Sequence, residues 1–418
     1  MPFRNLTLKT STSKNEYTEK NKDIERINMI FEPYGLKVDE VKEGAQVVRY
    51  ILHMPLDVKL QGKVRRATKD IEYTLSSALG TDEFSYHHSE DNLIIERKGK
   101  FNIVAFGDLY TTTFHNNTKG LAVMLGKDLD GKPVYTNLEK APHVLIAGTT
   151  GSGKSETIHD IIASLLMTKY RDMPSVVIPI IDIKGTEFNK YKDAYPVTIY
   201  KTADEAYRVL EQLCKTMDWR YKLLAENGCD DIDEYTSKGN KMSRIVCIID
   251  ELADLILQNR KVEDFIVRIA QKARACGIHL VIGTQSPRAD VVTGLIKANI
   301  PFKIALNTTT SLESRIVLDE NGAEKLFGKG DMLIKKGGNK PIHAQGAYVD
   351  DEDKAALNAL WNNGKHVDIF PSNNIPTTPT MPSKKKVGLI QGFKNIMRSP
   401  QATTPLQFIT IINKHPNS

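Results

Sequence analysis

From Ala147 the chain reads Ala147-Gly148-Thr149-Thr150-Gly151-Ser152-Gly153-Lys154-Ser155, which matches the phosphate-loop pattern G-x-x-x-x-G-K-S without a gap. Residues 143–147 before it suit a short buried strand, and the apolar residues after it recur on one face of a helix. In that setting the glycines let backbone N–H groups turn toward a phosphate, at the positive end of the helix dipole. Residues 148–155 therefore predict an ATP-binding loop, in which Lys154 contacts the β- and γ-phosphates and Ser155 holds Mg²⁺.

A pair of acids, Asp250-Glu251, directly follows an apolar run at 245–249. We expect Asp250 to hold the hydrated Mg²⁺ and Glu251 to orient and deprotonate an attacking water. Alternatively, the pair only starts a helix as a capping acid. Gln285 stands at the tip of the next expected strand, where it could touch the γ-phosphate or the water, because ligands bind at the carboxyl ends of strands in such sheets. Together these residues predict a nucleotide hydrolase.

Apolar runs that suit strands alternate with helical patterns around this loop. Strands are expected at 176–183, 245–249, 279–283 and 303–306, and helices at 203–226 and 262–276. A β-hairpin at 121–136 leads into the loop. The alternation predicts an α/β fold with a mostly parallel, doubly wound sheet over residues 113–366.

Three further segments flank this predicted nucleotide-binding domain. Residues 1–23 are rich in Lys, Asn, Thr and Ser and are expected to be a flexible lead. Residues 24–112 are expected to form a small α+β domain, with strands at 35–40, 45–54, 84–87 and 92–97 and a helix at 63–79. Residues 367–418 read as a basic, Pro/Thr-rich flexible tail.

Composition limits the class of protein. The chain has 418 residues, of which 40% are hydrophobic and 26% charged, as in ordinary globular proteins. It shows no apolar run long enough to span a bilayer, no secretory signal and no C-x-x-C spacing among its four cysteines. We therefore expect a cytoplasmic protein with reduced thiols. The net charge is +6, and the Lys and Arg residues after residue 370 account for all of it. The rest of the chain is therefore close to neutral, so any contact that it makes with nucleic acid needs a local patch of positive charge.

The tail contains one candidate for local structure. Apolar residues between 387 and 397 fall roughly on one helical face and follow Lys384-Lys385-Lys386. A basic amphipathic helix of this kind could bind a membrane surface or a protein partner. Gly388 and Gly392 weaken the helix, and the alternative is a solvated tail without fixed structure.

Several stretches resemble the FtsK/SpoIIIE family of DNA translocases over about residues 25–365. They are 141–155 around the phosphate loop, Arg268-Ile-Ala-Gln-Lys-Ala-Arg274 with Gly277-Ile-His279, 293–301, and Gly328-Lys-Gly-Asp-Met-Leu333. The resemblance implies a small front domain, a RecA-like motor domain and a hexameric ring around double-stranded DNA. It also implies that Arg274 completes a neighbouring subunit's ATP site, and that Lys297 and Arg315 lie on loops facing the central pore.

The chain departs from the family pattern at three places. Ser286 stands where members usually have arginine in Thr-Gln-Arg-Pro, and Arg288 is the candidate that would replace it and contact DNA. Asp182-Ile183-Lys184 stands where many members read Asp-Pro-Lys. Patterns for N-terminal membrane helices and for a C-terminal winged helix are missing from this sequence.

The leading hypothesis is an ATP-driven motor on double-stranded DNA, serving segregation, transfer or packaging. An ATPase of a protein-secretion system is the alternative, although such chains usually carry several motor domains and membrane helices. A nucleotide-binding switch without turnover is a third reading, against which Glu251 and Gln285 argue.

Overall fold

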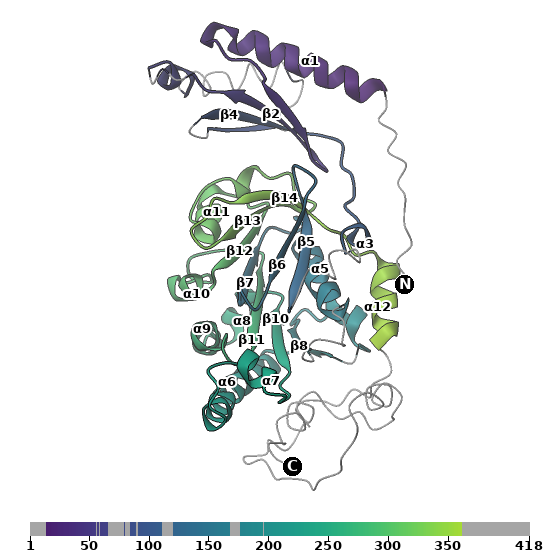
Figure 1. The fold of residues 1–418 in the computed structure, drawn as a ribbon, viewed down its shortest axis with the longest axis vertical. Coiled ribbons are helices and arrows are strands. Elements are labelled where there is room, and N and C mark those ends of the chain that lie inside the picture. The colour runs from purple at the N-terminus through teal and green to yellow at the C-terminus, as the bar shows by residue number, and fades with distance from the viewer. Residues whose placement is uncertain are drawn as a thin grey trace.

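The computed structural model describes residues 14–55, 57, 59–65, 79, 84–88, 91–110, 120–167, 176–194 and 196–361. Within these ranges the chain folds into a small front domain and a larger α/β domain, shown above and below in Figure 1. The predicted tail over 367–418, with its amphipathic segment, lies outside the described residues, as does almost all of the helix predicted over 63–79. The part of the chain that is described contains no helix long and apolar enough to cross a membrane.

The front domain is a four-stranded antiparallel sheet of order β1-β2-β4-β3, covered by helix α1. Ile27 and Phe31 of α1 are fully buried and pack with Tyr50, Leu52 and Leu93. The elements are α1 (Lys14–Phe31), η1 (Glu32–Tyr34), β1 (Glu40–Glu43), β2 (Val47–His53), β3 (Phe84–His88) and β4 (Asn92–Lys98).

Two predictions about this front region are wrong. The flexible lead was expected to run to residue 23, yet α1 begins at Lys14. The strand expected at 35–40 begins only at Glu40, because Gly35 takes a left-handed conformation (φ 68°) that ends η1. Apolar residues Ile24, Ile27 and Phe31, spaced three and four apart, are the helical signal that the polar composition obscured.

The larger α/β domain is built on a ten-stranded sheet of order β6-β5-β14-β13-β12-β7-β11-β10-β8-β9. The strands from β12 to β9 in that order are parallel, and the others extend the sheet antiparallel beyond β12. The predicted α/β fold with a mostly parallel sheet is confirmed. The strands are β5 (Ala122–Asp128), β6 (Pro133–Asn137), β7 (His143–Ala147), β8 (Val176–Ile181), β9 (Val197–Tyr200), β10 (Arg244–Ile249), β11 (Ile278–Thr284), β12 (Phe302–Leu306), β13 (Asp331–Lys336) and β14 (Ile342–Gly346).

Helices cover both faces of this sheet, so its central strands are buried on both sides. In β7, Leu145 and Ala147 pack into the core beneath α6, α8 and α9, whereas Val144 and Ile146 pack into the core beneath α5. The helices are α3 (Phe106–Leu109), α5 (Lys154–Met167), η2 (Phe188–Tyr191), α6 (Ala203–Glu226), α7 (Ile232–Ser237), α8 (Leu252–Gln258), α9 (Val262–Lys272), α10 (Gly294–Asn299), α11 (Ser311–Leu318), η3 (Ala323–Lys325) and α12 (Asp351–Trp361).

The boundary between the domains lies earlier than predicted. Val104, Phe106 and Leu109 belong to the core beneath α5, and the backbone N–H of Tyr348 donates to the carbonyl of Val104 at 2.9 Å. The larger α/β domain therefore begins near residue 104, where a boundary was expected after residue 112.

A network of charged side chains joins the two domains. His343 of β14 lies 3.0 Å from Glu96 of β4 through Nδ1, and 2.6 Å from Asp331 of β13 through Nε2. Arg49 of β2 pairs with the same Glu96. Burial alone would lower the pKa of His343, but the Asp331 and Glu96 carboxylates outweigh it and raise the pKa to about 10. A charged imidazolium therefore bridges a carboxylate from each domain.

Candidate nucleotide-binding site

The phosphate loop lies between β7 and α5, as the sequence predicts. Its turn needs glycine at two positions. Gly151 has φ 77° and Gly153 has φ 108°. A side chain at position 153 would also place its Cβ only 2.6 Å from the backbone nitrogen of Gly330. The loop is anchored at its start because the N–H of Thr149 donates to the Asn307 carbonyl at 2.9 Å. Backbone N–H groups are thus fixed at the N-terminus of α5, where an anion is favoured.

Lys154 and Asp250 form a buried pair beside this loop. The Lys154 ammonium donates to the Asp250 carboxylate and to the Asp250 carbonyl, both at 2.7 Å. Their side chains are 3% and 7% exposed. The parallel register of β7, β11 and β10 brings the two residues together, because the phosphate loop that leads from β7 to Lys154 and the residue that follows β10, Asp250, leave the sheet at the same edge.

Glu251 and Gln285 also meet at this edge. The Glu251 carboxylate accepts from the Thr284 hydroxyl at 2.8 Å and from the backbone N–H of Gln285 at 3.0 and 2.9 Å. The Gln285 side chain in turn accepts from the Thr150 hydroxyl at 2.9 Å. Burial raises the pKa of Glu251, an effect that the Lys154 charge partly offsets. A carboxylate with a raised pKa is better placed to take a proton near neutral pH than an ordinary surface glutamate.

The capping alternative for the Asp250-Glu251 pair does not fit this arrangement. Glu251 occupies the N-cap position of α8, but its side chain makes no capping hydrogen bond. Its carboxylate instead turns to the end of β11. The two acids are therefore directed to the phosphate loop and to the neighbouring strand.

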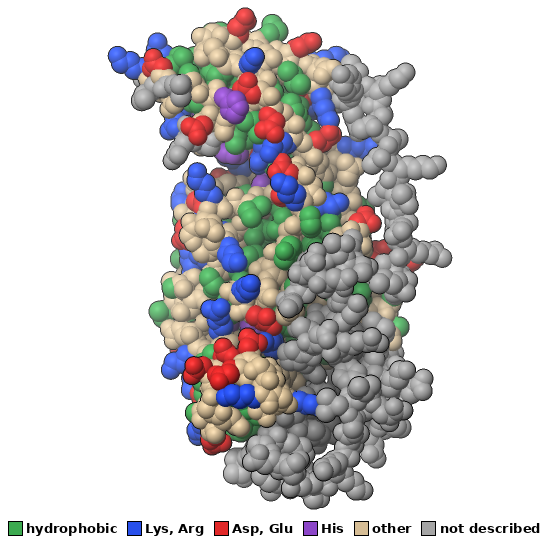
Figure 2. Space-filling view, in the orientation of Figure 1, with side chains coloured by type: hydrophobic (Ala, Val, Ile, Leu, Met, Phe, Trp, Pro, Cys, Tyr) green, Lys and Arg blue, Asp and Glu red, His purple; other side chains and the backbone are tan. Residues whose placement is uncertain are grey.

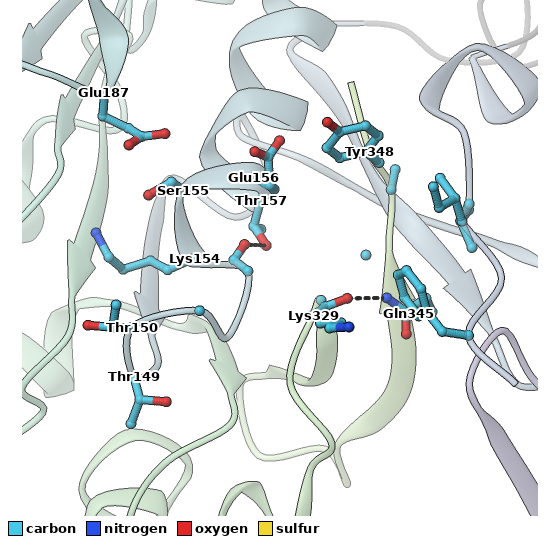
Figure 3. A pocket seen from close by; sticks show the side chains of 18 of the residues that line it. Thr149, Thr150, Lys154, Ser155, Glu156, Thr157, Glu187, Lys329, Gln345 and Tyr348 are labelled. Atoms are coloured by element: carbon cyan, nitrogen blue, oxygen red, sulfur yellow. Dashed lines mark hydrogen bonds between the residues drawn. The ribbon is translucent and has the colours of Figure 1, made fainter. Parts of the chain in front are cut away.

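A cavity of about 500 Å³ opens beside the loop (Figure 3). One side is formed by the loop and the first turn of α5, including Glu156 and Thr157. The opposite side comes from segments far away in sequence: 101–104, Lys329-Gly330 and 345–348. Its size is within the usual range for small-molecule sites, about 300–1,000 Å³.

Sequence reasoning missed the part played by residues 328–330. The N–H of Gly330 donates to the Ser152 carbonyl at 2.7 Å, and the Gly330 carbonyl accepts from Gly346 at 2.7 Å. Gly328 and Gly330 both have positive φ, and Lys329 between them has φ 51°. The Gly-Lys-Gly spacing was the available signal, because such a run permits a backbone to pass close to another backbone.

Arg274 lies on the far edge of the sheet from its own phosphate loop. It follows the end of α9 and precedes β11, and its Nε donates to the carbonyl of Glu139, which precedes β7. The five residues of β7 separate this edge from the loop by about 17 Å. Arg274 therefore cannot serve the site of its own chain from this position.

Of the three candidate DNA contacts, two lie in helices and one lies in a turn. Lys297 is in α10 and Arg315 is in α11, so the loop expected at these two residues is wrong. Thr310 and Glu313 form a capping box that starts α11, a pattern visible in the sequence. The Lys297 ammonium reaches the Arg315 carbonyl at 3.0 Å and Asp319 at 2.7 Å, which places the two residues side by side. Arg288 pairs with Asp290 at 3.3 Å in the turn after β11.

Comparison with known proteins gives the family. A model of the FtsK/SpoIIIE family matches residues 108–289. The DNA translocase FtsK of Clostridium acetobutylicum is 35% identical over 421 residues, which cover 96% of this chain and 54% of that protein. This chain belongs to the FtsK/SpoIIIE family. The DNA translocase SftA of Bacillus subtilis is 40% identical over 331 residues, which cover 76% of this family member and 34% of SftA.

This family member therefore spans about half, or less, of the length of those relatives. Among solved structures, the pCW3 conjugation coupling protein TcpA in its monomer form with ATPγS is 25% identical, with a TM-score of 0.58. That match covers 81% of this chain and 99% of TcpA. The Type VII secretion ATPase EccC of Thermomonospora curvata, 22% identical with a TM-score of 0.55, shares the fold.

Proposed function

We propose that this protein is an ATP-driven translocase of double-stranded DNA that works as a ring of identical subunits. The observation that carries the proposal is the assembly of Lys154, Asp250, Glu251 and Gln285 around the phosphate loop of an FtsK/SpoIIIE family member. Relatives named DNA translocases match along most of the chain. The activity is assigned to the cytoplasm, where both ATP and DNA are found.

The phosphate side of the reaction follows from the loop. Backbone N–H groups and the helix α5 dipole would bind the β- and γ-phosphates, and Lys154 would exchange its contact with Asp250 for the phosphate oxygens. The Ser155 hydroxyl and the Asp250 carboxylate are hard oxygen donors at the same loop, which fits Mg²⁺ bound jointly with phosphates. Bound Mg²⁺ would neutralise charge on those phosphate oxygens.

The water side of the reaction follows from Glu251 and Gln285. Glu251 would take a proton from the attacking water, and Gln285, tied to Thr150, would orient that water or the γ-phosphate. Arg274 would enter the site of a neighbouring subunit and stabilise the developing charge, since it lies far from its own loop. A ring of subunits, with six as the number expected for the family, supplies such a neighbour.

The DNA side is assigned to α10 and α11. Lys297 and Arg315 lie together there, and Figure 2 shows Lys and Arg side chains over this part of the surface. A motor that moves along any sequence needs contacts to phosphates and not to bases. We assign Lys297, Arg315 and Arg288 to such contacts.

The test is the rate of ATP hydrolysis by the full chain with and without linear duplex DNA. A large stimulation by duplexes of unrelated sequence is the expected result. Basal hydrolysis without stimulation would favour the secretion ATPase, for which the likeness to EccC supports only the fold. Binding without hydrolysis would favour a nucleotide switch.

A further inference from the structure

Residues 325–331 join η3 to β13 and contact both the front domain and the phosphate loop. Three consecutive residues of this segment have a left-handed backbone, with φ 76° at Gly328, 51° at Lys329 and 88° at Gly330. Glycine adopts this conformation freely, but lysine is strained in it, so neighbouring contacts have to hold the turn in shape. We call residues 325–331 the bridge segment.

On the side of the phosphate loop, the bridge segment donates hydrogen bonds to carbonyl groups of the loop. The N–H of Gly330 donates to the Ser152 carbonyl at 2.7 Å, and the N–H of Lys329 donates to the Gly151 carbonyl at 3.4 Å. The peptide between Ser152 and Gly153 is trans, so its carbonyl and its N–H point in opposite directions. A Ser152 carbonyl that is held toward the bridge segment therefore turns the N–H of Gly153 the other way, toward the start of α5, where an anion is favoured.

On the opposite side, side chains of both domains join the bridge segment to the front domain. Gln46, in the turn between β1 and β2, is only 2% exposed, and its Nε2 donates to the Gly328 carbonyl at 2.7 Å. Lys325 donates to the carbonyl of Tyr86 in β3 at 3.1 Å, and its ammonium lies 5.1 Å from the centre of the Tyr86 ring. The front domain thus contacts the bridge segment near both of its ends.

The charged network between the domains supports the same turn. One oxygen of the Asp331 carboxylate accepts from the N–H of Phe327 at 2.8 Å, and the other pairs with His343. The N–H of Asp331 also donates to the Gly328 carbonyl, at 3.0 Å. That carbonyl therefore accepts one hydrogen bond from within the bridge segment and one from Gln46 of the front domain.

We propose that Gln46 is a positioning residue for ATP turnover, which acts on the phosphate loop through the bridge segment. Its hydrogen bond fixes the Gly328 carbonyl, the left-handed turn fixes Gly330 in consequence, and Gly330 fixes the Ser152 carbonyl. Gln46 lies outside the lining of the nucleotide cavity, so the front domain contributes to the site without touching the nucleotide. Because coupling between two sites is reciprocal, bound nucleotide should also strengthen the contact that Gln46 makes.

This inference rests on the nucleotide binding that the proposed function requires, but not on DNA movement or on ring formation. Gln46→Met keeps the approximate volume of the side chain and removes its hydrogen-bond donor. The variant should bind ATPγS and inorganic tripolyphosphate more weakly, each by about 5-fold, the ratio expected for loss of one net hydrogen bond. Both ligands are affected because the contacts lead to the phosphate loop.

The experiment is a calorimetric titration of the full chain with each ligand, at a temperature at which circular dichroism shows every variant to be folded. Lys325→Ala removes another front-domain contact of the bridge segment and should also weaken both ligands, by a smaller factor. Lys42→Ala is the matched control, because Lys42 of β1 also crosses to the larger domain, where it pairs with Asp130 between β5 and β6 at 2.7 Å. This control should bind both ligands as the wild type does.

Hydrogen exchange gives a second readout, which a purely structural role of Gln46 would not change. ATPγS should slow exchange in peptides over 325–331 and also in peptides over the β1–β2 turn at 44–46. In Gln46→Met, the first effect should remain and the second should be lost. Slowing of the turn at 44–46 to the same extent in both proteins would contradict the proposal.

Unchanged affinity of Gln46→Met for both ligands overturns the proposal. An equal loss in Lys42→Ala also overturns it, because any loosening between the domains would then weaken the site. Loss of ATPγS binding alone does the same, since the effect would not pass through the phosphate loop. If Gln46→Met does not fold, Lys325→Ala decides, and unchanged affinities there overturn the proposal. If the wild type binds neither ligand, the proposed ATPase function fails, and this inference fails with it.

Discussion

Two lysine–aspartate pairs of equal length stand in different surroundings. Lys154 and Asp250 lie 2.7 Å apart with side chains 3% and 7% exposed, whereas Lys297 and Asp319 lie 2.7 Å apart with side chains 20% and 53% exposed. Exposed pairs contribute about 0–1 kcal/mol, and loss of one partner of a buried pair costs about 3–5 kcal/mol. Breaking the first pair is therefore costly unless another charged group replaces the lost partner, whereas the second pair can open toward a ligand at little cost.

The largest effect is expected at the buried pair. Lys154→Ala should remove both nucleotide binding and turnover, because the phosphates lose their cation and Asp250 is left without its partner. Glu251→Gln should keep binding but reduce turnover by about 10²–10⁴-fold, because the base is lost while the loop is unchanged. Equilibrium binding of ATPγS and steady-state hydrolysis measure the two effects separately.

Glu226→Gln, on the exposed end of α6, is the control for removal of a carboxylate. Wild-type hydrolysis by Glu251→Gln would show that another group activates the water. Nucleotide binding by Lys154→Ala at the wild-type affinity would place the phosphates elsewhere.

The second effect concerns Arg274, which we propose acts in the ATP site of a neighbouring subunit. Arg274→Ala should lower hydrolysis by about 10³–10⁵-fold, the contribution of a finger arginine where it has been measured. Mixing this variant with Glu251→Gln should restore part of the activity, because one subunit then supplies the arginine and the other the base. Arg260→Ala is the matched control. Arg260 is an arginine that lies on the turn between α8 and α9, away from the end of α9 that Arg274 follows. Absence of recovery at every mixing ratio, with rings formed, would contradict a shared site.

The positions in the fold that the sequence predicted most closely are those that depend on local patterns, whereas the roles of the site residues stay predictions. Lys154 follows from a contiguous motif, and α6 runs from Ala203 to Glu226 as its apolar spacing indicates. Asp250, Glu251 and Gln285 meet because parallel strands end at one edge, a general rule that needs no tertiary detail.

The residues that were missed depend on pairing between distant segments. Strands β13, β14 and β5 extend the sheet antiparallel, and this extension carries Gly330 to the loop and His343 to the front domain. The hydrophobic periodicity of a short stretch of sequence does not show which distant strands will pair. For Arg315 a local signal was available. The capping box of Thr310 and Glu313 predicts that a helix begins there, whereas a loop was expected.

A third effect, intermediate in size, tests the buried charges between the domains. His343→Gln should destabilise the protein by about 3 kcal/mol at pH 6, because Glu96 and Asp331 lose the cation between them. The pKa of His343 is raised to about 10 in the fold, so its contribution is full below the ordinary pKa of histidine and is lost as the pH rises through 10. The gap between wild type and variant should therefore narrow from pH 6 to pH 10.

Denaturant unfolding at pH 6, 8 and 10 measures that gap, with His53→Gln on the exposed end of β2 as the control. A gap that stays constant with pH would mean that His343 is neutral in the fold. A gap that widens would have the wrong sign for a cation held by two carboxylates.

The smallest effect is expected at the exposed pair. Lys297→Ala and Arg315→Ala should weaken duplex binding alike on unrelated sequences, because phosphate contacts carry no sequence information. Each lost contact should lower the slope of log K against log salt by about 1. Basal hydrolysis should stay near the wild-type rate while stimulation by DNA falls, since α10 and α11 lie outside the lining of the nucleotide cavity. Salt titrations of both variants, beside Lys222→Ala on the exposed face of α6, measure this. Unchanged slopes would remove both residues from the DNA path and leave Arg288 as the next cation to test, because its Asp290 partner is also exposed and can release it.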